Sequence, residues 1–198
     1  MILTYKYRIK DSVSRKALCA HARNVNFIWN FCNQQDRDII DGYNAGKIAK
    51  LKSLSNFDMN LLLKGKSKET GLNSLTIQSI SDNFAIAKSS SIKKSKSRKT
   101  SGQKSFIPII NWRSYKRHLG WIPLKAKAFQ WNETDSTITY QKKVYKFWKS
   151  RPLPADAIIK TGSFNEDSKG RWYINITFES SKVMSNHPKP NRALVGID

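Results

Sequence analysis

Hydrophobic and polar positions follow two different periods along the N-terminal part of the chain. Apolar and polar residues alternate over residues 3–9, which predicts a half-buried β-strand. From about residue 13 to residue 40, apolar residues recur every three or four positions, which predicts one long amphipathic helix that ends before Gly42. The same spacing over residues 75–86 predicts another helix. The pattern therefore indicates one strand followed by a helical region.

The C-terminal half shows short β-type runs instead. These runs cover residues 125–131, 137–148, 158–164 and 171–178. A turn over residues 165–170 separates the last two, which predicts a β-hairpin. One strand before the helices and several after them favour an α+β fold in which a helical insertion interrupts a small β-barrel.

The charge of the chain is strongly positive, with 36 Lys and Arg against 14 Asp and Glu and a formal net charge of +22. Such an excess predicts a polyanionic partner. No acidic residue occurs between Asp82 and Glu133, an interval that holds twelve Lys and Arg. Within it, residues 88–104 are rich in Ser and Lys, and we expect them to form a flexible basic loop.

Aromatic residues are interleaved with these cations, and aromatic rings can stack on unpaired bases. The alternative is a solvated cationic loop beside an ordinary aromatic core. Gln78, on the second predicted helix, could contact base edges. The alternative is that it belongs to the solvent-exposed face of that helix. The candidate contacts to the nucleic-acid backbone are Lys93, Lys94, Lys96, Arg98, Lys99, Arg113, Lys116 and Arg117.

Several classes of protein are excluded by what the sequence lacks. It has no secretory signal and no apolar run of membrane-spanning length, so we expect a cytoplasmic protein with no membrane partner. Cys19 and Cys32 lack the spacing of a zinc site or a disulfide framework. No motif for a nucleotide cofactor or nucleophilic catalysis is present, and we expect no small-molecule substrate. Asp198 ends an apolar run, and it is either an incidental chain end or a metal-binding carboxylate.

Six segments, in this order, resemble the TnpB family, the OrfB proteins of insertion sequences. They are TYKYRI, FIWNFCNQ, NWRSYKRHLGWIP, SRPLP, TGSFNEDSKGRWYINITFE and VGID. Members of this transposase-like family are RNA-guided DNA endonucleases. The resemblance covers essentially the whole chain, which corresponds to the N-terminal half of a family member. The most specific part is GRWYINITFE followed by a linker and VGID, whose Asp opens the RuvC nuclease domain in this family.

The resemblance implies a division of the chain into domains. The expected parts are a wedge domain, an oligonucleotide-binding-like β-barrel, at residues 1–10 and 105–182, a helical recognition domain at 11–104, a linker at 183–191 and the start of a truncated RuvC domain at 192–198. In the family, the wedge and recognition domains bind the guide RNA and read a short motif in the double-stranded target DNA.

The resemblance also implies a role for Asp198 as the first of the metal-binding carboxylates that hold Mg²⁺ in full-length family members. One carboxylate cannot hold two metal ions, so we expect that this chain alone binds no cofactor and does not cleave DNA. Two alternatives remain at this point. The chain could be a nuclease-lacking, stand-alone DNA- or RNA-binding protein or repressor of the same origin, or a basic RNA-binding protein of the ribosomal type.

Overall fold

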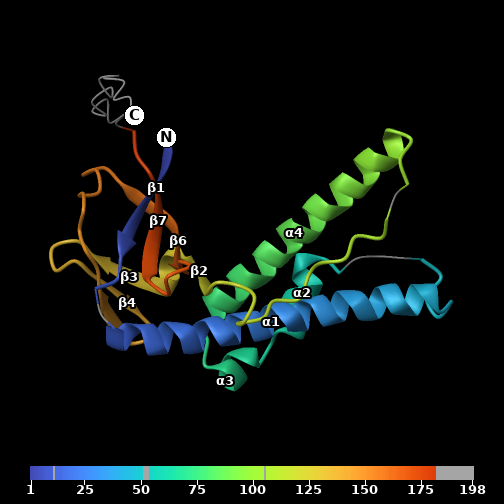
Figure 1. The fold of residues 1–198 in the computed structure, drawn as a ribbon, viewed down its shortest axis with the longest axis horizontal. Coiled ribbons are helices and arrows are strands. Elements are labelled where there is room, and N and C mark those ends of the chain that lie inside the picture. Colours follow the sequence, from blue (N-terminus) through green and yellow to red (C-terminus); the bar gives the residue numbers. More distant parts are fainter. Residues whose placement is uncertain (11, 51–53, 105, 182–198) are drawn as a thin grey trace, which may run out of the picture.

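Two antiparallel sheets and a set of helices make up the part of the chain that the computed structural model describes, residues 1–10, 12–50, 54–104 and 106–181 (Figure 1). In chain order the elements are β1 (Ile2–Arg8), α1 (Ser12–Asn44), α2 (Asn56–Leu62), α3 (Lys66–Thr70), α4 (Ser74–Thr100), β2 (Trp121–Lys125), the 3₁₀ turn η1 (Ala126–Ala128), β3 (Phe129–Asn132), β4 (Thr137–Tyr140), β5 (Lys143–Lys146), β6 (Ile158–Glu166) and β7 (Trp172–Glu179). The α+β class predicted from the sequence is confirmed.

The four-stranded sheet has the order β1-β7-β6-β2, with all neighbours antiparallel. Strand β1 pairs with β7 from Ile2↔Glu179 to Arg8↔Tyr173, so the first strand finds its partner at the far end of the described chain. The predicted hairpin over residues 158–178 is present as β6 and β7. Every second residue of β7 is buried, as its alternating pattern predicts.

The second sheet consists of β3, β4 and β5 in that order. The sequence pattern indicated a single run over residues 137–148, but the chain turns back at Gln141 and Lys142. Both residues have positive φ angles, 50° and 63°, and they form a two-residue hairpin turn. A two-residue turn with positive φ angles has the same right-handed twist as the two strands that it connects. The chain can therefore form a hairpin here, although neither turn residue is the usual Gly or Asn.

The strand pairing joins β1–β7–β6–β2 and β3–β4–β5 into two sheets and does not close a barrel within the described residues. A single bridge between Ile9 and Phe147 links them. The run predicted as one strand over residues 125–131 is interrupted by η1, so β2 and β3 belong to different sheets. Pro123 lies in β2, an edge strand, where its missing N–H is tolerated. The expected small β-barrel is therefore replaced by two sheets.

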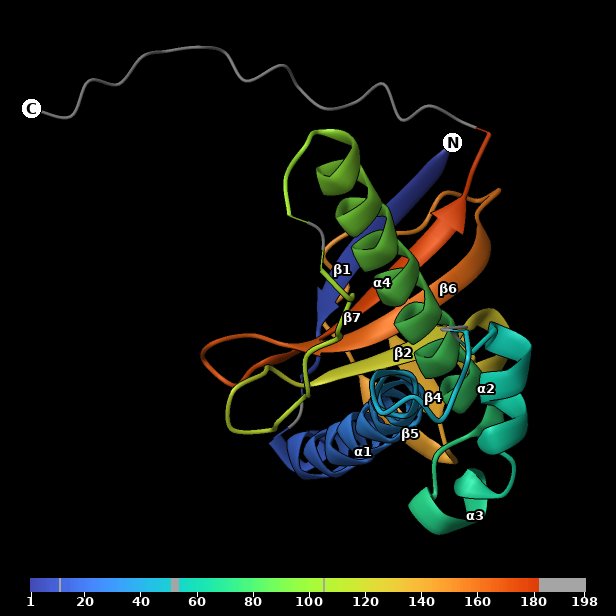
Figure 2. The ribbon, with the colours of Figure 1, turned by 90° about the vertical axis from the view of Figure 1, so that its right-hand side faces the viewer.

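One hydrophobic cluster unites the strands and the helices. Tyr5, Tyr7, Trp172 and Phe178, predicted to lie in the core, are all buried. The apolar face of α1 packs in the same cluster, and the helix runs from the sheets to the other end of the molecule (Figure 1). Figure 2 looks along α1, with α2 and α3 on its right. The helices therefore share one hydrophobic core with the sheets, although residues 11–104 were expected to form a separate helical domain inserted into the barrel.

The prediction of a flexible basic loop over residues 88–104 is wrong for most of that range, because α4 continues as a helix to Thr100. Its outer half projects away from the sheets (Figure 1). Lys88 and Ser95, seven residues apart on one helical face, are buried, and each is bound to another segment. Lys and Arg also favour helix, so these contacts suffice to order a segment with few apolar residues.

Several further predictions concern the C-terminal residues, the domain boundaries and the two cysteines. The linker at 183–191 and the expected RuvC start at 192–198 lie outside the described residues. The division into wedge and recognition domains stays a prediction. Cys19 and Cys32 lie on α1 and form no disulfide. No helix in the described part is long and apolar enough to span a membrane.

Candidate nucleic-acid interface

The outer half of α4 carries five of the predicted contacts, Lys93, Lys94, Lys96, Arg98 and Lys99, and all five side chains are exposed. At 100° per residue these positions are distributed around the helix, not along one stripe. None of the five forms an ion pair with a carboxylate of the described chain. The structure thus presents a projecting helix with cations on several sides.

Two buried polar side chains fix this helix to the rest of the fold. Lys88 forms an ion pair with Asp36 of α1, and its Nζ also donates to the carbonyl of Pro108 at 2.7 Å. One helical heptad further on, Ser95 Oγ donates to the carbonyl of Phe106 at 2.6 Å. The return segment is therefore bound to α4 at Phe106 and Pro108, and the cations have a fixed support.

A second group of predicted contacts, Arg113, Lys116 and Arg117, lies on the loop between α4 and β2. The loop is attached to α1 by a reciprocal pair of hydrogen bonds. Asn30 Nδ2 donates to the carbonyl of Arg113 at 2.8 Å, and the Arg113 N–H donates back to Asn30 Oδ1 at 2.8 Å. An amide side chain thereby takes the place of a strand neighbour, and the loop keeps a defined position over α1.

The side chain of Arg113 differs from the other predicted contacts because it is half-buried. Its Nε donates to Asn26 at 2.9 Å, and its guanidinium lies 5.7 Å from the ring centre of Trp29 and 5.1 Å from that of Trp121. Burial lowers the pKa of this guanidinium from its ordinary value. Arg113 therefore packs against two indole rings, whereas Lys116 and Arg117 are exposed.

The loop and the helix meet at one cleft of about 670 Å³, which Ile86 and Ala87 of α4 line together with Arg117. Lys93 and Lys94 follow Ile86 and Ala87 by seven residues, so they lie on the same face of α4 two turns further out. Lys93 and Lys94 of the first group therefore lie on the side of α4 that faces the cleft, to whose lining Arg113 and Arg117 of the second group contribute.

Gln78 is exposed and lies near the N-terminal end of α4, whereas the cations from Lys93 to Lys99 lie near its C-terminal end. Its Oε1 accepts a hydrogen bond from Lys125 Nζ at 3.5 Å, and that ammonium also lies 2.9 Å from the carboxylate of Asp82. The amide group of Gln78 is thus attached to the last residue of β2, an edge strand of the four-stranded sheet. It is not part of the surface formed by the outer half of α4.

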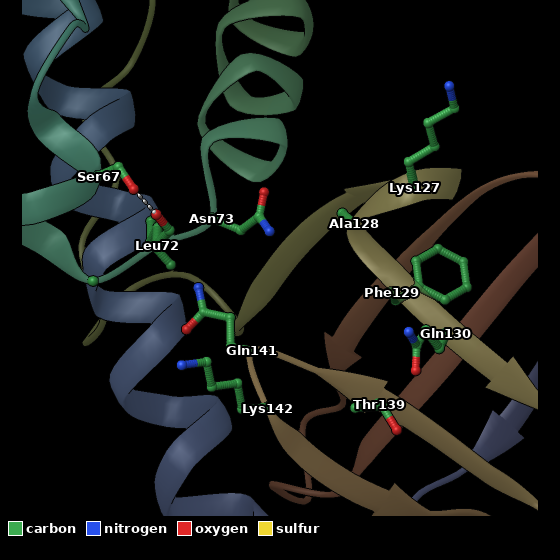
Figure 3. A pocket seen from close by; sticks show the side chains of 11 residues that line it. Ser67, Leu72, Asn73, Lys127, Ala128, Phe129, Gln130, Thr139, Gln141 and Lys142 are labelled. Atoms are coloured by element: carbon green, nitrogen blue, oxygen red, sulfur yellow. Dashed lines mark hydrogen bonds between the residues drawn. The ribbon is translucent and has the colours of Figure 1, made fainter.

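Another polar cleft, of about 700 Å³, opens between the start of α4 and the three-stranded sheet. Figure 3 shows Asn73, the N-cap residue of α4, and Gln141, in the β4–β5 turn, among the side chains that line it. Lys127 and Lys142 add positive charge to its lining. The sequence did not point to Gln141 and Lys142, since only the reversal of the chain between β4 and β5 brings them to this cleft.

The aromatic residues among the cations divide into buried and exposed members. Phe129 is buried, and Trp121 and Trp131 are half-buried in or against the core. The exposed rings each lie beside an arginine guanidinium: Phe106 beside Arg98, Trp112 beside Arg37 and Tyr115 beside Arg23. Both interpretations of the aromatic residues, core packing and surface stacking, therefore apply to part of the set.

Asp198, the predicted catalytic and Mg²⁺-binding carboxylate, lies outside the described residues. Among residues 1–10, 12–50, 54–104 and 106–181, no three His, Cys, Asp or Glu side chains come together as a metal site would require. A scan against models of protein families found no match, and a search of curated proteins found none either.

Proposed function

We propose that this chain is the nucleic-acid-binding half of a TnpB-like RNA-guided DNA endonuclease of an insertion sequence. In this proposal it binds a guide RNA and the double-stranded target DNA that carries the recognition motif. The four-stranded and three-stranded sheets would form the wedge, and the helices α1 to α4 the recognition domain. The six sequence segments that resemble the family supply the specific part of this proposal.

The observation that carries the binding function is the set of exposed cations on α4 and on the loop before β2. Of the twelve Lys and Arg between Asp82 and Glu133, only Lys88 and Lys125 form an ion pair with a described carboxylate. Uncompensated cations on a fixed support repel one another, which destabilises the free protein. A phosphate backbone removes this repulsion and releases its own counterions, so binding is favoured.

The shape of α4 supports contact with more than one strand. Because its cations lie on several sides of the helix, a nucleic acid that meets only one side would leave some of them unpaired. A helix fits between the two backbones that flank a groove, where cations on opposite sides each meet a phosphate. Gln78, at the base of the same helix, would then contact base edges near the sheet.

The binding proposal is tested by reversing charge on the outer half of α4. The variant carries Lys93→Glu, Lys94→Glu, Lys96→Glu and Arg98→Glu, and RNA affinity is measured over a range of salt concentrations. We expect affinity to collapse and the slope of log K against log salt to fall by about 3, since each of the four lost phosphate contacts contributes about 0.7–0.9.

A matched control reverses four exposed cations elsewhere, Lys16, Lys47, Lys50 and Lys146, and changes the net charge by the same amount. If both variants lose affinity equally, the outer half of α4 contributes only net charge and the proposal fails. The RNA that co-purifies with the unchanged chain after a high-salt wash gives a second test. A discrete RNA transcribed beside the gene supports a guide, whereas bulk ribosomal RNA contradicts it.

The nuclease part of the proposal predicts that residues 1–198 alone do not cut DNA. Asp198 would bind Mg²⁺ together with carboxylates that this sequence does not contain. Guide-directed cleavage by this chain with Mg²⁺, RNA and target would contradict that expectation. The encoding DNA after codon 198 separates a longer nuclease from a nuclease-lacking binder, since an in-frame Leu-Gly with later Glu, Asp and C-x-x-C residues supports the nuclease.

A further inference from the structure

The cleft of about 670 Å³ between α4 and the loop before β2 has one aromatic wall and one polar edge. Trp121 is half-buried and lines the cleft, and its ring is braced by Trp29 at 6.1 Å between ring centres and by the guanidinium of Arg113. The two ring planes are almost perpendicular, at 83°. A flat, rigid group of this kind is what an unpaired base stacks on.

The polar edge is formed by Glu166 and Asn165 at the end of β6. Glu166 is fixed by two hydrogen bonds with Gly120: its Oε2 accepts from the Gly120 N–H at 3.0 Å, and its own N–H donates to the Gly120 carbonyl at 2.8 Å. A Cβ at Gly120 would lie 2.3 Å from the ring of Trp172, so no larger residue fits there without rearrangement.

This edge keeps one acceptor and one donor for a ligand. The second carboxylate oxygen of Glu166, Oε1, accepts no hydrogen bond from any residue that the structure describes. Asn165 Oδ1 accepts from Ser163 and Asn175, at 2.7 Å and 2.8 Å, while its Nδ2 has no acceptor within the described chain. Successive side chains of a strand point to opposite faces of the sheet, so Glu166 Oε1, and not a pair formed with Asn165, is the group that would accept a hydrogen bond from a base amino group.

A second cleft, of about 490 Å³, adjoins the first and shares Arg117 and Glu166 with it. Its cations are Arg15, Lys116, Arg117 and Lys169, and none of them forms an ion pair within the described residues. Its other carboxylate, Asp167, is already bound by Arg171 Nε at 2.7 Å. The second cleft therefore has the charge to hold a phosphate beside the base.

We infer that these two clefts together bind a single unpaired nucleotide, with an amino-bearing base between Trp121 and Glu166 and its phosphate among the cations of the second cleft. The strand then continues along α4 past Lys93 and Lys94, which share the helical face of Ile86 and Ala87. This inference deepens the proposed nucleic-acid-binding function, because it names the nucleotide class that one part of the surface selects.

Uracil is the base that this edge disfavours. Its only ring donor, N3–H, lies between two carbonyl oxygens, which the carboxylate of Glu166 would repel, whereas cytosine and adenine present an amino group. The difference amounts to about one charge-assisted hydrogen bond, which predicts an affinity for CMP and AMP about tenfold to a hundredfold higher than for UMP. Thymine is disfavoured for the same reason.

The test is a titration of the whole chain with CMP, AMP and UMP, followed by nuclear magnetic resonance of the tryptophan indole N–H groups. The Trp121 signal is assigned by its loss in Trp121→Phe. We expect this signal to shift and saturate with CMP and AMP at lower concentration than with UMP. Equal affinity for all three, or saturation by ribose 5-phosphate at the same concentration, would overturn the inference.

Two variants separate the base from the phosphate. Glu166→Gln keeps an oxygen for the Gly120 N–H but adds a donor, so the preference for CMP over UMP should disappear. Arg117→Ala with Lys169→Ala should weaken all three nucleotides about equally; an unchanged affinity would contradict the phosphate site. Equal loss of RNA affinity in the fourfold α4 variant and in its matched control would contradict the proposed function, whereas equal affinity for CMP, AMP and UMP would contradict this inference, so the two failures give different results.

Discussion

Lys88 of α4 and Asp36 of α1, 52 positions apart in the sequence, form an ion pair that is almost completely buried. The same ammonium donates to the carbonyl of Pro108, so one side chain joins α1, α4 and the return segment. A buried ion pair stabilises little in net terms because both charges lose their hydration. Its effect here is to determine where α4 leaves α1, and so the position of the cationic surface.

Removal of one partner of this pair should be costly. Lys88→Met leaves the carboxylate of Asp36 buried without a cation, and we expect a loss of about 3–5 kcal/mol in the free energy of unfolding. The double variant Lys88→Met/Asp36→Leu buries no charge and should regain most of that loss. Denaturant unfolding of the two single variants, the double variant and the unchanged chain measures this. Additive losses in the double variant would show that the two residues do not interact.

The helical state of residues 88–100 is the second prediction. Ser90 is exposed in the interior of α4, and Ser90→Pro removes a helical hydrogen bond and clashes with the preceding turn, at a cost of about 3 kcal/mol. We expect faster hydrogen exchange over residues 91–100 and weaker RNA binding, because the cations lose their common support. Ser90→Ala, which favours helix, is the matched control and should have the opposite effect on exchange. Unchanged exchange in the Pro variant would mean that this segment is not helical in solution.

The regular elements could be predicted from the sequence because their signals are local. The alternation in β1 and β7 and the long helical period in α1 each follow from one stretch of chain. The outer half of α4 could not, because this segment has the composition of a disordered chain and because Asp36, which determines where α4 leaves α1, lies far away in the sequence. The division of 137–148 into two strands was missed for a similar reason, since Gln141 and Lys142 are not typical turn residues.

The candidate site shows the same limit. The cations on α4 and on the following loop are visible in the sequence as a run without acids. The cleft that joins them is not visible, because it depends on contacts between distant segments, such as Asn30 with Arg113 and Gly120 with Glu166. Charge is a property of composition, whereas the arrangement of a binding surface depends on tertiary contacts.

The β4–β5 turn gives a third prediction. Lys142 has a φ of 63°, a left-handed conformation that costs an ordinary L-residue about 1 kcal/mol and costs Gly almost nothing. Lys142→Gly should therefore be more stable than Lys142→Ala by about 1 kcal/mol, although Ala is the more stable of the two at most positions. Both variants remove the same charged side chain, so thermal or denaturant unfolding compares the backbone effect alone. A more stable Ala variant would mean that the turn has a different conformation.

Alkaline pH should destabilise the fold through its buried tyrosines. Burial raises the pKa of Tyr140 and of Tyr145 to about 12, and it also raises the pKa of Tyr7. In the unfolded chain these hydroxyls lose their protons near pH 10, before the folded state does. The folded state therefore binds more protons between pH 10 and 12, and its stability is complete below pH 10 and falls as the pH rises through this interval.

The measurement is the free energy of unfolding at several pH values from 8 to 12, for the unchanged chain and for Tyr140→Phe. The variant loses the hydrogen bond between the Tyr140 hydroxyl and Thr76, 3.1 Å apart, and should be less stable at pH 8 by about 1 kcal/mol. It also loses one titrating group, so its stability should fall less steeply above pH 10, and the difference between the two proteins should shrink toward pH 12. A constant difference over the whole range would show that the Tyr140 hydroxyl has the same pKa in the folded and unfolded states.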